Sequence, residues 1–253
     1  MKKTKNFLDW NNRILASSMK KLNWNIVLII ILDAVFYVIS AYLFVLWDKK
    51  RKALSPNMPE PTQLIALGYE KAQQALAQTK SYLFFIIFSL LLLLLIIIFL
   101  ATIIKGIIWA KTLNKKLNLK LISKFLGLNL LWMSFWMLLI FLNSMFVEIS
   151  RAPVFMIIIL VLAFYFTNTL YALFFEKQKL SVIVEAVKLN VSKIHLFLVP
   201  YALIIAVLMI VAKLTNLMTF KYSFAASSFI MLVYFALVRY YASTLALEVE
   251  KLK

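Results

Sequence analysis

The stretch from Tyr82 to Ile104 reads YLFFIIFSLLLLLLIIIFLATII and contains no charged residue. A helix advances about 1.5 Å per residue, so a run of this length can cross about 30 Å of hydrocarbon. Peptide groups in hydrocarbon have no water to bond, and a helix satisfies them within a single segment. This stretch therefore predicts a transmembrane helix and decides the fold class.

Five further stretches show the same apolar character. The last two contain Pro200 and Arg239, and a membrane helix tolerates a proline, while an arginine near its end can extend its charge to the interface. We therefore predict an all-α polytopic membrane protein, a single membrane domain over residues 1–253 with about six transmembrane helices. The predicted spans lie near residues 24–47, 81–106, 125–147, 154–175, 195–213 and 223–246.

The overall composition agrees with a membrane protein. Of all residues 64% are hydrophobic and 15% are charged, whereas a soluble domain is typically about half apolar. The net charge of +18 would suggest a nucleic-acid partner in a soluble protein. Here the basic residues flank the apolar stretches, which favours anionic lipid head groups as their partner. We expect a lipid bilayer as the main partner and no nucleic acid.

The basic residues also predict the orientation of the chain in the membrane. Of the 28 lysines and arginines, 19 fall on the side of the predicted spans that holds both termini. Because lysine and arginine are enriched on the cytoplasmic side, we expect both termini to be cytoplasmic in a multi-pass protein of the cell membrane.

Three segments outside the spans have a pattern of their own. Residues 48–80 are predicted to form an external loop that contains a helix, since residues 62–80 are rich in helix-forming residues and have few breakers. Residues 1–22 and 180–194 place apolar side chains at helical spacing, which predicts amphipathic helices on the membrane surface. The alternative is that both are linkers packed against the bundle. The apolar sets are Phe7, Trp10, Ile14, Leu15, Met19 and Leu22, and Leu180, Ile183, Val184, Val187, Val191 and Ile194.

Residues suited to catalysis are scarce. His195 is the single histidine, so the chain cannot supply the two-histidine zinc site of an intramembrane metalloprotease. Three separated glycines cannot form a phosphate-binding loop, and without cysteine there is no thiolate metal site. We therefore predict no catalytic, metal or cofactor site and no enzymatic activity.

Asp33 is the one acidic residue deep within an apolar stretch. A lone carboxylate in hydrocarbon is costly unless it is paired or protonated, and such residues are functional candidates. Arg239, and as a second choice Lys105, lie in spans at a similar depth, so we predict an intramembrane ion pair of Asp33 with one of them. Three interpretations stay open: a static pair that fixes helix register, a proton or ion pathway, and exposure to lipid or water.

The stretch EAVKLNVSK from Glu185 to Lys193 lies between the fourth and fifth predicted spans. It resembles an amphipathic helix at the same place in prokaryotic six-helix membrane proteins, among them the membrane-anchor domain of glycerophosphoryl diester phosphodiesterases. The resemblance covers mainly residues 176–200 and implies a six-helix fold in a membrane, with no known activity. It transfers no active-site residue, because the sequence contains no phosphodiesterase catalytic domain.

The sequence thus favours a non-enzymatic membrane component that acts through lipid or protein contacts, with other membrane subunits as candidate partners. The alternative is a small permease or channel with an intramembrane site at Asp33. A continuous polar cavity reaching Asp33 would favour transport, and a dry, packed interior would favour the first interpretation.

Overall fold

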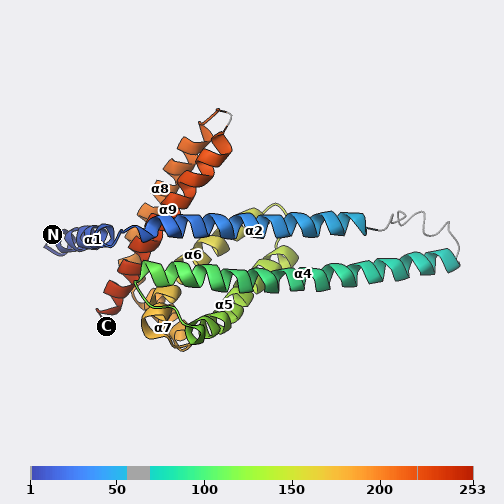
Figure 1. Cartoon of the computed structure of the whole chain (residues 1–253), viewed down its shortest axis with the longest axis horizontal. Helices are drawn as coiled ribbons and strands as arrows, with labels where there is room; N and C mark the ends of the chain where they lie inside the picture. The colour runs from blue at the N-terminus through green and yellow to red at the C-terminus, as the bar shows by residue number, and fades with distance from the viewer. Residues whose placement is uncertain (1, 56–68, 221, 253) are drawn as a thin grey trace. The chain divides into compact units, whose positions relative to one another are not determined.

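The computed structural model describes residues 2–55, 69–220 and 222–252, which contain eight helices and no strand (Figure 1). Six of these helices, all except α1 and α7, are long and apolar enough to cross a membrane, which confirms the predicted all-α polytopic fold. The helices are α1 (Lys2–Lys20), α2 (Asn25–Ala53), α4 (Tyr69–Thr112), α5 (Leu119–Phe146), α6 (Ala152–Lys177), α7 (Val182–Ser192), α8 (Ile194–Asn216) and α9 (Ser223–Glu250).

The chain divides into two compact units. Unit 1 comprises residues 1–34 and 102–253, and unit 2 comprises residues 35–101. Helices α2 and α4 each pass from one unit into the other. Unit 1 contains all the remaining helices and, with them, the predicted site.

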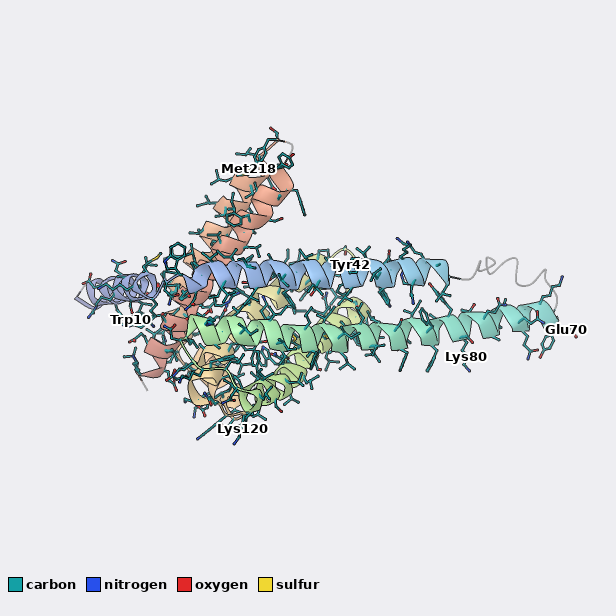
Figure 2. All side chains as sticks on the ribbon, viewed as in Figure 1. Trp10, Tyr42, Glu70, Lys80, Lys120 and Met218 are labelled. Atoms are coloured by element: carbon teal, nitrogen blue, oxygen red, sulfur yellow. The ribbon has the colours of Figure 1, made fainter. Side chains whose placement is uncertain are left out.

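Within unit 2, polar groups join the two long helices at one end. The indole N–H of Trp47 donates a hydrogen bond of 3.0 Å to Ser89, and the hydroxyl of Tyr82 donates one of 3.1 Å to the carbonyl of Arg51. The polar stretch with Glu70 and Lys80 continues without a break into the apolar part of α4 (Figure 2). The helix expected over residues 62–80 is thus present from Tyr69 onward, and residues 56–68 lie outside the described part of the chain.

The core of unit 1 surrounds the second half of α6. Every residue from Asn168 to Phe175 is buried, because α6 is packed by α5, α7 and α9 on different sides. Phe125 of α5 places its ring within 5.0 to 5.4 Å of the rings of Tyr171, Phe174 and Phe175. The tightest packing therefore lies at the end where α4, α6 and α9 finish and α5 begins.

The two short amphipathic helices both pack against this bundle. Helix α1 lies on α9 with Ile14 buried, and just after it the ammonium of Lys21 donates a hydrogen bond of 3.1 Å to Thr244. Burial of that ammonium lowers the pKa of Lys21. Helix α7 buries Val182, Ala186 and Leu189, whereas Val184, Val187 and Val191 stay exposed. Each helix thus joins the bundle on one side and keeps apolar residues free on another.

Helices α8 and α9 form an antiparallel hairpin with Met218 at its tip (Figure 2). Pro200 lies buried within α8, and the helix continues past it. Toward the tip, large apolar side chains such as Met209 and Phe229 are more than half exposed. In a bilayer, these side chains meet hydrocarbon, which solvates them as well as a protein interior would.

Phe125→Ala should lower the free energy of unfolding by a few kcal/mol, because it removes a fully buried ring and leaves a cavity against three aromatic neighbours. Thermal unfolding in mild detergent measures the effect. Phe141→Ala on the same helix is the matched control, since Phe141 is 57% exposed and should change stability little. Equal losses in the two variants would contradict the placement of the core around Phe125.

Candidate functional site

Asp33 lies at the centre of a buried ion cluster in unit 1. Its oxygen Oδ1 is 2.5 Å from Nζ of Lys105, and its oxygen Oδ2 is 2.8 Å from Nη2 of Arg239. Asp33 itself is 1% exposed. The structure therefore brings together all three residues that the sequence singled out, and Asp33 contacts both basic partners where the sequence hypothesis chose one.

Each residue of the cluster comes from a different helix. Asp33 follows the start of α2 at Asn25 by about 12 Å of helix, and Lys105 precedes the end of α4 at Thr112 by about 11 Å. Arg239 reaches the same level from α9. The two ion pairs therefore join three helices at one level.

The electrostatics of the cluster are unbalanced. One carboxylate faces two cations, so the formal charge of the cluster is +1. Nη1 of Arg239 is buried without a hydrogen-bond partner among the described residues. In surroundings of low polarity the attraction to Asp33 is strong, and so is the cost of leaving a charge unpaired. Asp33 is therefore the group that keeps both cations inside the bundle.

A second polar network lies deeper in the same unit. The amide of Asn129 donates a hydrogen bond of 3.0 Å to the hydroxyl of Thr102, and the hydroxyl of Tyr171 donates one of 2.6 Å to the Asn129 carbonyl oxygen. The network joins α4, α5 and α6. Asn129 stands out in the sequence as a polar residue within a span, but no pattern marks Tyr171 as its partner.

Further ion pairs join helix ends next to the buried core. Lys177 at the end of α6 lies 2.5 Å from Glu185 of α7 and 2.5 Å from Glu250 of α9. Lys115 lies 2.8 Å from Glu176. His195 is exposed in the first turn of α8. Among the described residues no group of three or more His, Asp or Glu side chains is placed to hold a metal ion.

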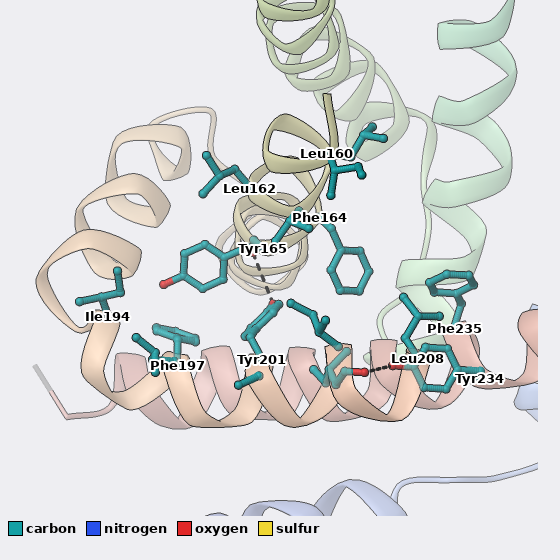
Figure 3. A pocket seen from close by; sticks show the side chains of 16 residues that line it. Leu160, Leu162, Phe164, Tyr165, Ile194, Phe197, Tyr201, Leu208, Tyr234 and Phe235 are labelled. Atoms are coloured by element: carbon teal, nitrogen blue, oxygen red, sulfur yellow. Dashed lines mark hydrogen bonds between the residues drawn. The ribbon is translucent and has the colours of Figure 1, made fainter. Parts of the chain in front are cut away.

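Unit 1 has an apolar crevice between α6, α8 and α9, with a volume of about 710 Å³ (Figure 3). Its walls are aliphatic and aromatic. Three tyrosines line it, and their hydroxyls are turned to backbone carbonyls: Tyr165 to Asn190, Tyr201 to Tyr165, and Tyr234 to Ile204. The crevice thus offers hydrocarbon contact and few free polar groups. No sequence pattern predicted it.

Comparisons with protein-family models, curated proteins and solved structures find no match to this chain. The arrangement of its own residues therefore carries the interpretation of function.

Asp33→Asn should destabilise the protein by about 3–5 kcal/mol, because it leaves the buried guanidinium of Arg239 and the partly buried ammonium of Lys105 without their counter-charge. Arg239→Gln should cost less, since Asp33 and Lys105 then form a neutral pair. Thermal unfolding of the purified variants in detergent gives the order.

The combined variant Asp33→Asn, Lys105→Gln, Arg239→Gln is the control for loss of charge as such. It removes every formal charge of the cluster and should recover much of the stability lost in Asp33→Asn. If Asp33→Asn unfolds at the same temperature as the unchanged protein, the cluster does not hold the helices together.

Proposed function

We propose that this integral membrane protein is a non-enzymatic membrane component that acts through contacts with lipids or with other membrane proteins. The observation that carries the proposal is the closed state of the cluster around Asp33. Both carboxylate oxygens are engaged by cations and the residue is 1% exposed, so the acid is a structural clamp. A carboxylate that carries protons or ions must exchange with water.

The hollows of unit 1 support the same proposal. The crevice between α6, α8 and α9 and a smaller hollow of about 410 Å³ between α1, α8 and α9 have almost entirely apolar walls. Neither is lined by Asp33, Lys105 or Arg239. A transport route to Asp33 would have a polar lining continuous with water, and these hollows lack that character.

Exposed apolar side chains provide the contact surface. They cover the outer parts of α5, α6, α8 and α9, where residues such as Phe141, Val154, Leu203 and Phe229 are each more than half exposed. A patch of this extent marks an interaction surface. Lipid chains or apolar faces of membrane partners match it.

Orientation and location are part of the proposal. We place both termini in the cytoplasm, with the protein in the cell membrane, because most lysines and arginines lie on the side of the termini. These residues would meet anionic head groups there. The similarity to the phosphodiesterase membrane-anchor domain stays a prediction, and it adds a membrane location without an activity.

Proteoliposomes with an imposed pH gradient distinguish this proposal from a permease or channel. We expect the reconstituted protein to dissipate the gradient no faster than empty liposomes, and Asp33→Asn to leave that rate unchanged, because Asp33 is 1% exposed and both its oxygens are engaged by cations. A pH-sensitive dye inside the vesicles measures the rate. Proton flux that disappears in Asp33→Asn and persists in Arg151→Gln, an exposed charge away from the cluster, would overturn the proposal.

A further inference from the structure

We propose that the crevice between α6, α8 and α9 binds one hydrocarbon chain of an anionic phospholipid, with the lipid phosphate at Lys193. This inference deepens the proposed function, on which it rests, by naming the ligand class and the place where it binds. It concerns residues that are not part of the Asp33 cluster.

The walls of the crevice select hydrocarbon. They come from three helices that are long and apolar enough to cross a membrane, so lipid is the solvent that reaches them. The hydroxyl of Tyr165 already donates to the carbonyl of Asn190. The hydroxyls of Tyr201 and Tyr234 donate to the carbonyls of Tyr165 and Ile204 (Figure 3). A polar ligand would find few partners there and would lose its own hydration, whereas a lipid chain has no hydration to lose.

The size of the side chains argues against a transmembrane helix as the occupant. Close approach of two membrane helices uses small residues that let the backbones come together. The crevice has Ala202 as its one small lining residue, and the others are large, for example Leu160, Phe164, Phe197 and Leu208. Flexible lipid chains fit between such side chains better than a rigid helix does.

The dimensions of the crevice suit a lipid chain. Along α8 its lining runs from Ile194 to Leu208, about 21 Å of helix. That length exceeds half of a hydrocarbon core of about 30 Å, so a chain that enters at one interface can extend along it. The volume of about 710 Å³ lies in the range of small-molecule sites.

The charge at one end of the crevice selects the head group. Ile194, a lining residue, is the first residue of α8, and it is flanked by Lys193 and His195. Tyr165 places this end next to α7, since its hydroxyl bonds to the carbonyl of Asn190 at 2.9 Å. Lys193 is thus a cation at the boundary between the apolar crevice and the polar end of the bundle. A phosphate above a bound chain would meet it there.

Native mass spectrometry of the full chain tests the proposal with phosphatidylglycerol and phosphatidylcholine of equal chain length. The unchanged protein should retain phosphatidylglycerol at higher occupancy than phosphatidylcholine. Ala202→Trp fills the crevice and should lower the occupancy of both lipids. Lys193→Glu should weaken retention of phosphatidylglycerol by about fivefold or more and leave phosphatidylcholine nearly unchanged, because it alters only the charge at the phosphate.

Two matched variants control for the substitutions themselves. Met209→Trp adds a tryptophan on an exposed face of α8 outside the crevice, and Lys213→Glu reverses a charge at the opposite end of the same helix. Both should retain lipids like the unchanged protein. Melting temperatures of all four variants show whether each is folded.

Three results would overturn the proposal. Equal lipid retention in folded Ala202→Trp and Met209→Trp would show that the crevice holds no chain. Equal loss of phosphatidylglycerol in Lys193→Glu and Lys213→Glu would show that the lipid phosphate does not bind at Lys193. A change of oligomer mass in Ala202→Trp with unchanged lipid retention would make a second copy of the chain the occupant. None of these three results requires proton flux in liposomes. The proposed non-transport function is therefore tested separately, by the proton-flux experiment.

Discussion

Hydrogen bonding of the peptide group in hydrocarbon is the constraint on which the whole structure depends. Six long helices satisfy it within their own backbones, and that frees their side chains from any need to form a water-excluding core. Tight packing is therefore concentrated around the second half of α6, while the outer parts of α5, α8 and α9 present large apolar residues. In a soluble protein such surfaces would aggregate, but in a bilayer they are ordinary solvent contacts.

The same low polarity makes an unpaired charge inside the bundle costly, and in this structure the buried carboxylate is paired with two cations. Asp33 engages Lys105 and Arg239 at once, so three helices meet at one carboxylate. We propose that a cluster of this kind serves to set helix register and not to perform chemistry. The crevice between α6, α8 and α9 is open and has apolar walls, and for that reason we propose a role in lipid contact instead of one for the acid.

Much of this could be predicted from the sequence. The apolar stretches give six helices long and apolar enough to cross a membrane, since length and hydropathy alone decide them. The helices themselves run past the predicted spans, most of all α4, which begins at Tyr69. Asp33 with two candidate cations follows from the rarity of charge in those stretches. The packing face of the amphipathic segments could not be predicted from the sequence. For residues 180–194 the apolar set includes Val184, Val187 and Val191, yet α7 packs on the bundle through Val182, Ala186 and Leu189. Helical spacing identifies apolar faces but does not say which one meets protein and which meets lipid.

The sequence by itself determined that this chain is a bundle of membrane-spanning helices and which charged residues lie within it, because both depend on local composition and on the length needed to cross hydrocarbon. Only the tertiary structure decided that Asp33 takes two partners, that Tyr171 completes a network with Asn129 and Thr102, and that α6, α8 and α9 leave a crevice between them. These features depend on crossing positions and rotations of helices far apart in the chain. In lipid, where one apolar face resembles another, packing of particular side chains sets those positions, and a single sequence pattern does not encode them.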